Sequence, residues 1–144
     1  MRFSIIIPLY NEEKTINELL FKLHNIDFYK YFEDVEIIVV DDGSTDNSLE
    51  IVKNFPTQKY NIKIIKNETN RGKGYSLIHG IKISKGDIIL FQDADLELLP
   101  EDIPSIIETM FKLNVDLVNG SRYLPGIPRP LSSYYRYLGN KLFS

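Results

Sequence analysis

Apolar runs alternate along this chain with segments in which apolar residues recur at helical spacing. Four of the runs are rich in β-branched residues, which is typical of strands buried within a sheet. They are FSIIIPLY at 3–10, VEIIVV at 35–40, NIKIIK at 61–66 and DIILF at 87–91. A fifth, short strand is predicted at 116–120 (DLVNG).

Helices are predicted between these strands. Four apolar residues, Ile16, Leu19, Leu20 and Leu23, share one face of a first helix that Asn11 is placed to cap. Further helices are expected from caps at 44–47 through residue 52, at 75–83, at 100–113 and, with amphipathic spacing, at 134–143. Strands alternating with helices predict an α/β fold, a mostly parallel sheet with flanking helices and right-handed crossovers. The whole chain, 1–144, is expected to form a single domain.

Composition narrows the class of protein. With 43% hydrophobic residues the 144-residue chain can build a core, and its net charge of −3 gives no sign of nucleic-acid binding. The absence of cysteine excludes disulfides and thiolate metal sites. The N-terminus lacks the order of a secretory signal, and the apolar runs are too short to span a bilayer. These features predict a cytoplasmic protein.

Acidic residues follow two of the predicted strands, where a parallel sheet places its ligands. These acids are Asp41, Asp42, Asp93, Asp95 and Glu97. Because the carboxyl ends of parallel strands meet at one edge, the carboxylates would repel one another without a cation. A hard divalent metal, Mg²⁺ or Mn²⁺, is one candidate, since it prefers oxygen ligands. Nearby basic side chains are the other: Arg71, Lys73 and Arg122.

The segment Asp93-Ala94-Asp95 can place two carboxylates on the same side, because residues i and i+2 of an extended segment point the same way. Other interpretations stay open at this stage. The acids can be solvated turn residues or helix caps, and Asp41 or Asp42 can cap the helix that follows. Lys73, between two glycines, can lie in a solvated turn.

Five motifs, in order, resemble family 2 glycosyltransferases with the GT-A fold. They are IIPLYNEE, VVDDGSTDNS, NRGKGYSLIHG, GDIILFQDADLELLPED and NGSRY, which together span most of the chain. The chain is most similar to the branch of dolichyl-phosphate mannosyltransferase-like and polyprenyl-phosphate sugar transferases. The resemblance implies a Rossmann-like nucleotide-sugar-binding fold.

The resemblance also implies roles for individual residues. A nucleotide-sugar donor would contact Pro8, Tyr10, Glu12, Val40, Asp42, Lys73, Asp93, Ala94, Asp95 and Arg122. The metal, Mg²⁺ or Mn²⁺, would be held by Asp93, Asp95 and Glu97. Catalysis would involve Asp95, Arg122 and Arg136, with Arg129 competing with Arg136 for the acceptor phosphate.

The implied reaction is an inverting transfer of a sugar from a GDP- or UDP-linked donor to a polyprenyl or dolichyl phosphate. Such an acceptor is already anionic, so no general base is needed, and no further conspicuous acidic motif follows Arg122. Domains of this branch continue further, so the nucleotide half is expected complete and the acceptor half short or missing. The helix at 134–143 would then contact a partner subunit or the inner face of the membrane.

Two other classes remain as alternatives. One is a nucleotide-sugar-binding module, or a truncated and inactive transferase, that needs a partner chain. The other is a phosphoacceptor receiver-like domain. It ranks behind because its acid pair should follow the first strand, whereas Asp41 and Asp42 follow the second.

Overall fold

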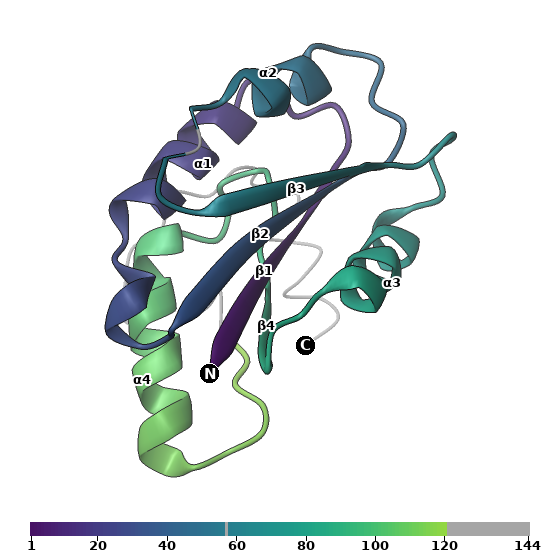
Figure 1. The fold of residues 1–144 in the computed structure, drawn as a ribbon. Helices are drawn as coiled ribbons and strands as arrows, with labels where there is room; N and C mark the ends of the chain where they lie inside the picture. Colours follow the sequence, from purple (N-terminus) through teal and green to yellow (C-terminus); the bar gives the residue numbers. More distant parts are fainter. Residues whose placement is uncertain (57, 121–144) are drawn as a thin grey trace, which may run out of the picture.

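The fold is built on a four-stranded parallel sheet. The computed structural model describes residues 1–56 and 58–120. Its strands are β1 (Arg2–Leu9), β2 (Asp34–Asp41), β3 (Asn61–Lys66) and β4 (Ile88–Phe91). They lie in the order β3-β2-β1-β4, and every paired strand is parallel (Figure 1). The predicted α/β class is confirmed.

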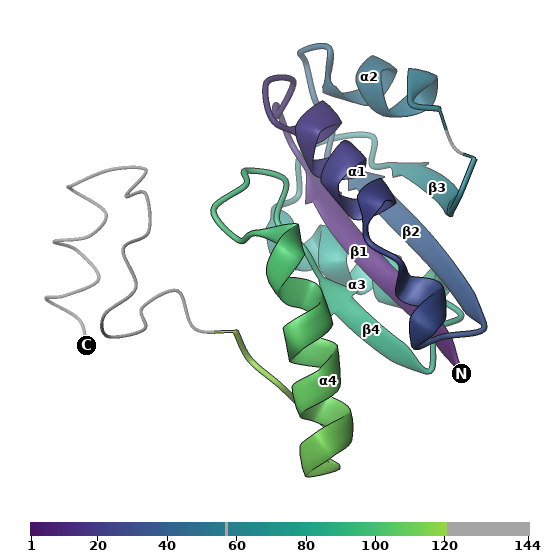
Figure 2. The same cartoon turned by 90° about the vertical axis from the view of Figure 1, so that its left-hand side faces the viewer.

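Helices cover both faces of the sheet. They are α1 (Ile16–Asn25), α2 (Ser48–Asn54), α3 (Lys73–Ile83) and α4 (Ile103–Leu113), with 3-10 turns η1 (Phe28–Lys30) and η2 (Pro100–Asp102). Figure 2 shows α1 and α4 in front of the sheet and α3 behind it. Among the described helices, none is both long enough and apolar enough to cross a bilayer.

The two faces of the sheet bury cores of different size. Alternate residues of β1, such as Ile5 and Ile7, face the larger core, which α1 fills with Leu19 and Leu23. On the opposite face a small cluster of Ile6, Ile38 and Val40 packs against Leu77 of α3. The long apolar runs of β1 and β2 are explained by this burial on both faces.

The register of the sheet brings the strand ends to one edge. Leu9 pairs with Asp41, and Asp41 pairs with Lys66. On the other side of β1, Ile6 pairs with Phe91, the last residue of β4. The segments that begin at Tyr10, Asp42, Asn67 and Gln92 therefore all leave the sheet at its carboxyl edge.

The predicted strand at 116–120 is wrong. No strand lies there, and α4 ends at Leu113, after which Asn114 adopts a left-handed conformation with φ 48°. Leu117 is 82% exposed, so the apolar side chains of this segment do not face a core. A strand needs a pairing partner as well as apolar residues, and the described residues offer it none.

The predicted capping of the first helix by Asn11 is also wrong. The helix begins at Ile16, and its N-cap residue is Thr15. Asn11 instead adopts a left-handed conformation with φ 54°, and its side-chain oxygen accepts a hydrogen bond of 2.8 Å from the Thr45 amide. The competing use of Asn11, as a link between two loops, decides its position.

Candidate functional site

A pocket of about 380 Å³ opens at the carboxyl edge of the sheet. Residues from the ends of three strands and from the start of α3 line it: Pro8, Leu9, Tyr10, Glu12, Asp42, Asn70, Gly72, Lys73, Ser76, Asp93, Ala94, Asp95 and Glu97. Among these described residues five are acidic, and Lys73 is the one basic side chain. The pocket thus brings together acids that are distant in the sequence.

Two loops are joined to each other above β1 and β2. The side chain of Ser48 accepts a hydrogen bond of 2.7 Å from the Glu12 amide, and Ser44 accepts one from the Asn11 amide. In the other direction, Asn11 accepts from Thr45. These bonds hold together the wall of the pocket that carries Tyr10 and Glu12.

Asp42 is a buried carboxylate that organises a third loop. It accepts hydrogen bonds from the Asn67 side chain at 2.8 Å and from the backbone amides of Arg71 and Gly72, the latter at 2.7 Å. Burial raises the pKa of Asp42, but these donors outweigh it, so the pKa lies below its ordinary value. Asp42 is therefore ionised at neutral pH, and it caps no helix.

Gly43 allows this third loop to approach β2 closely. Its φ of 75° is left-handed, and a Cβ atom there would lie 3.0 Å from the Asn70 amide nitrogen. Both the backbone conformation and the space favour glycine at this position. The glycine of the DDGS motif is thus explained by local packing beside the pocket.

Lys73 and Asp93 form an ion pair inside the pocket. The Lys73 ammonium lies 2.5 Å from one carboxylate oxygen of Asp93, whose side chain is only 16% exposed. Lys73 is the first residue of α3, while Asp93 follows β4. The Lys73 ammonium therefore reaches toward one of the pocket's acids. Lys73 begins a helix and does not lie in a turn, but its side chain is 57% exposed, so the expectation that it is solvated holds in part.

Asp95 and Glu97 lie on a tight turn after Asp93. Leu96 between them has a left-handed φ of 60°, and the Glu97 amide donates a hydrogen bond of 3.0 Å to Asp95. Within residues 1–56 and 58–120, no group of three or more His, Cys, Asp or Glu side chains is placed to hold a metal ion by itself. The three acids predicted as metal ligands line one pocket without converging on a common point.

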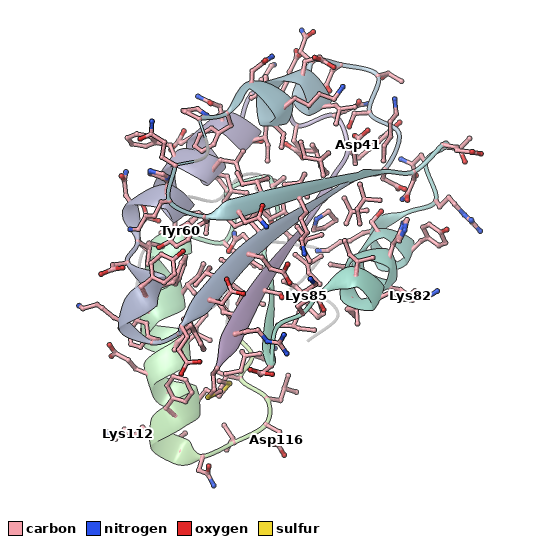
Figure 3. All side chains as sticks on the ribbon, in the orientation of Figure 1. Asp41, Tyr60, Lys82, Lys85, Lys112 and Asp116 are labelled. Carbon is pink, nitrogen blue, oxygen red and sulfur yellow. The ribbon has the colours of Figure 1, made fainter. Side chains whose placement is uncertain are left out.

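Asp41 differs sharply from its neighbour Asp42. It is the last residue of β2 and fully buried, and Figure 3 shows it at the carboxyl end of the sheet. One of its carboxylate oxygens accepts a hydrogen bond from the Ser44 amide. The other, Oδ2, has no hydrogen-bond partner among the described residues. Neither acid of the pair caps α2, because Asp46 accepts the hydrogen bond from the Ser48 amide.

Most of the predicted donor-binding residues meet in the pocket. Pro8, Tyr10, Glu12, Asp42, Lys73, Asp93, Ala94 and Asp95 all line it, as does Glu97. Val40 does not, because it is fully buried in the small core beneath α3. The predicted roles of Arg122, Arg129 and Arg136 and the helix at 134–143 lie outside the described residues.

Three polar residues of the site escaped the sequence analysis. Asn70 and Ser76 line the pocket, and Asn67 is a buried partner of Asp42. A signal for Asn67 was present, because it directly follows the strand at 61–66 and so leaves the sheet at the same edge as the acids. Acidic residues at strand ends indicate a binding site through their charge, whereas a neutral amide side chain gives no such indication.

Comparison with known proteins places this chain in a family. Residues 4–138 match the sequence profile described as "Glycosyl transferase family 2". The chain belongs to glycosyl transferase family 2. It is 37% identical, over 142 residues, to the dolichol-phosphate mannosyltransferase of Pyrococcus furiosus. That alignment covers 98% of this chain and 39% of the archaeal protein, so the chain spans about two fifths of this relative's length.

Two solved structures have the same fold. Residues 1–349 of Staphylococcus aureus TarS, in complex with UDP-GlcNAc, match with a TM-score of 0.62 and 40% identity. The match covers 77% of this chain and 32% of that one. A mannosyltransferase from Pyrobaculum calidifontis, in complex with GDP-Man and Mn²⁺, matches with a TM-score of 0.56 and 27% identity. It covers 65% of this chain and 27% of the other, and both structures support the predicted GT-A class.

Proposed function

We propose that this chain carries the donor-binding part of a glycosyltransferase that moves a sugar from a GDP- or UDP-linked donor. The acceptor is a polyprenyl or dolichyl phosphate or a related anionic group, and the transfer proceeds with inversion. One observation carries the proposal: eight of the ten residues that the family resemblance assigns to the donor line a single pocket at the carboxyl edge. The solved relatives contain UDP-GlcNAc and GDP-Man, which are donors of this class.

The pocket suits the two ends of such a donor. Pro8, Tyr10 and the carboxylate of Asp42 lie on the side fixed by β1 and β2, where a base and ribose would bind. Asp42 is ionised and rigidly held, so it can accept a hydrogen bond from the base. Lys73 is the cation in reach of the diphosphate, because its ammonium already lies beside Asp93. Negative charge grows on the diphosphate as the sugar leaves, and a fixed cation stabilises it.

The carboxylates of the pocket also suit a divalent cation. Asp93, Asp95 and Glu97 offer carboxylate oxygens in one pocket, and Mg²⁺ commonly binds through one or two carboxylates together with substrate phosphates. A cation bound there would supply Lewis-acid stabilisation of the leaving diphosphate. This arrangement needs no group of three protein ligands. In this proposal Asp93 and Asp95 hold the cation, with Glu97 beside them.

The acceptor is the less constrained half of the proposal. The archaeal relative is named a dolichol-phosphate mannosyltransferase, which favours a lipid phosphate and hence work at a membrane surface. TarS is named a poly(ribitol-phosphate) β-N-acetylglucosaminyltransferase, a different acceptor class on the same fold. A phosphate acceptor is an anionic nucleophile at neutral pH. Arg122 and Arg136 are proposed to contact it.

Thermal unfolding with nucleotides tests the donor site. The chain is heated with UDP, GDP and their sugar conjugates, with and without Mn²⁺ or Mg²⁺, as wild type and as Asp93→Ala. A ligand that binds only the folded state adds about 2.7 kcal/mol to the free energy of unfolding at a hundredfold excess over its Kd. The melting temperature rises as a result. We expect metal-dependent stabilisation by one of the two nucleotide classes, lost in Asp93→Ala.

The same assay separates the proposal from its alternative. Stabilisation by a donor, followed by sugar transfer to a polyprenyl phosphate in a product assay, supports the transferase. Stabilisation without transfer to any phosphate acceptor supports a nucleotide-sugar-binding module that requires a second chain. A folded protein that no nucleotide stabilises contradicts both.

A further inference from the structure

Behind the pocket, a chain of buried hydrogen bonds runs from Asp42 to α3. Asn67, which is 5% exposed, donates through its side-chain nitrogen to Asp42 at 2.8 Å and to the Ser76 hydroxyl at 3.2 Å. Its side-chain oxygen lies 2.9 Å from Nδ1 of His79. Asn67 itself is fixed at the sheet edge, because its backbone amide donates to the Asp41 carbonyl at 2.8 Å. Every polar atom of this side chain is thus used.

Asp42 and His79 together fix which way the Asn67 amide points. An ionised carboxylate can only accept, so the amide nitrogen of Asn67 faces Asp42. The amide oxygen then lies against Nδ1 of His79, which holds this orientation by donating to it. The reverse orientation would set the amide oxygen against the carboxylate of Asp42. The imidazole ring packs edge-on to the Tyr75 ring, with centroids 6.0 Å apart, which limits its rotation.

The consequence reaches the pocket through Asp42. Its carboxylate holds the backbone amides of Arg71 and Gly72, and the neighbouring residues Asn70 and Lys73 line the pocket. A rotated Asp42 would release these amides and change the shape of the pocket wall. Asp42 itself is one of the residues that line the pocket, where the proposed nucleotide would bind.

We propose that Asn67 is a positioning residue for the nucleoside diphosphate, acting through Asp42, and that His79 holds the Asn67 amide in the orientation that Asp42 requires. The inference rests on the proposed donor site and adds two residues to it that do not touch the ligand. It requires that changes at Asn67 and His79 alter nucleotide affinity in a protein that stays folded. The Ser76 hydroxyl accepts a hydrogen bond from the same Asn67 nitrogen that donates to Asp42, so Ser76 is the third member of the network.

The test measures the Kd of UDP and of GDP by calorimetry in the presence of Mn²⁺. Asn67→Asp keeps the shape but replaces the donor with a carboxylate facing Asp42, and we expect binding to weaken at least tenfold. His79→Phe removes the donor to Asn67 and should weaken binding about three- to tenfold. His79→Gln keeps an amide donor, and we expect it to restore most of the affinity. All titrations are run where circular dichroism shows each variant folded.

A matched control separates positioning from a general change in charge or stability. Asn54→Asp makes the same chemical change on α2, where the Asn54 side chain donates to the Glu50 carbonyl at the surface. We expect its nucleotide affinity to equal that of the wild type. Amide exchange at Arg71 and Gly72 gives a second readout that needs no ligand, and it should accelerate in Asn67→Asp and His79→Phe.

The outcomes distinguish the inference from the function on which it rests. If the wild type binds UDP or GDP and folded Asn67→Asp and His79→Phe bind it equally well, the inference is wrong and the donor site stands. Equal losses in His79→Phe and His79→Gln would also contradict it, because the amide donor would then be irrelevant. If the wild type binds neither nucleotide, the proposed function fails and the inference fails with it.

Discussion

At the scale of single residues, the pocket is defined by how its charges are neutralised. The charge of Asp42 is stabilised by neutral hydrogen-bond donors, a side-chain amide and two backbone amides. Asp93 is approached by a full positive charge, the Lys73 ammonium. A carboxylate held by fixed backbone amides keeps its place, whereas an ammonium on a flexible stem can leave. Asp42 is thus suited to a constant contact, and Asp93 is suited to an exchange of partners.

Removal of the Lys73 charge should therefore change metal affinity. In the proposed metal site the ammonium of Lys73 would compete with a divalent cation for Asp93, so we expect Lys73→Met to bind Mn²⁺ about three- to tenfold more tightly in the absence of nucleotide. Binding is measured by electron paramagnetic resonance of free Mn²⁺. Binding of the nucleoside diphosphate should weaken in the same variant, because the diphosphate loses a cation.

Lys82→Met is the control for that experiment. It removes the same charge from the other end of α3, where Lys82 does not line the pocket. An equal gain in Mn²⁺ affinity in both variants would mean that overall charge, and not the contact with Asp93, is responsible.

At the scale of elements, the position of α3 depends on a glycine at its contact with the sheet. Its Gly80 faces Ile6 of β1, and a Cβ atom there would lie 2.5 Å from a methyl carbon of Ile6. Ile6 is fully buried in the small core, so it has little room to move. The close approach of α3 to the sheet brings its first turn, with Lys73 and Ser76, to the pocket.

Two glycines of the same helix should therefore respond to alanine in opposite ways. Gly80→Ala overpacks the contact with Ile6, and we expect it to lower the free energy of unfolding by about 1–3 kcal/mol. Gly74→Ala meets nothing within 4 Å, so it should stabilise the protein by up to about 1 kcal/mol through helix propensity. Urea titrations followed by circular dichroism measure both. Stabilisation by both substitutions would contradict the packing derived for Gly80.

The sequence predicted the elements better than it predicted their ends. The apolar runs at 3–10 and 35–40 were reliable because burial on both faces leaves a strong signal. Asn11 misled, because a residue that suits a helix cap also suits a loop-to-loop hydrogen bond, and a tertiary contact with Thr45 decided the matter. The segment at 116–120 misled for a similar reason, since pairing partners are not visible in a local pattern.

The site was predictable to the extent that charge and strand ends reveal it. The acids after β2 and β4 were found because they stand out against the apolar strands that precede them. Asn67 was not, because its importance comes from what Asp42 and His79 require of it. Contacts between neutral polar residues that are distant in the sequence can be recognised only from the three-dimensional structure.

At the scale of the whole molecule, another buried carboxylate ties the sheet together away from the pocket. Glu36 of β2 accepts hydrogen bonds from Ser4 of β1 at 2.7 Å, from Lys63 of β3 and from the Lys85 amide before β4. Burial raises its pKa, but the bonds from Lys63, Ser4 and Lys85 outweigh that effect and hold the pKa below its ordinary value of 4.5. One side chain thus links three strands and the segment that leads into the fourth.

This linkage predicts a pH dependence of stability. A carboxyl group whose pKa is lower in the folded state stabilises the protein above its unfolded pKa, and this contribution is lost as the pH falls through the folded value. The free energy of unfolding should therefore drop below about pH 4.5, and Glu36→Gln should flatten that part of the profile while lowering stability at pH 7 by about 1–3 kcal/mol. Urea titrations from pH 3 to 7 provide the measurement.

Glu50→Gln is the matched control for the pH profile. Glu50 pairs with Lys53 on the surface of α2, where an ion pair contributes little. Its profile should follow that of the wild type. If Glu36→Gln also followed it below pH 4.5, other carboxylates would be responsible for the acid sensitivity.

The strand order also has a consequence for how the chain acquires its shape. β1 is formed from the first residues of the chain, yet one of its neighbours, β4, begins at Ile88. Parallel strands cannot be joined by a tight hairpin, so every pairing in this sheet closes a long loop and slows folding. During synthesis one edge of β1 therefore stays open until Phe91 has emerged from the ribosome. Until then the apolar β1 is at risk of association with other chains. Chaperone binding to nascent chains from which Phe91 has not yet emerged would reveal this exposure.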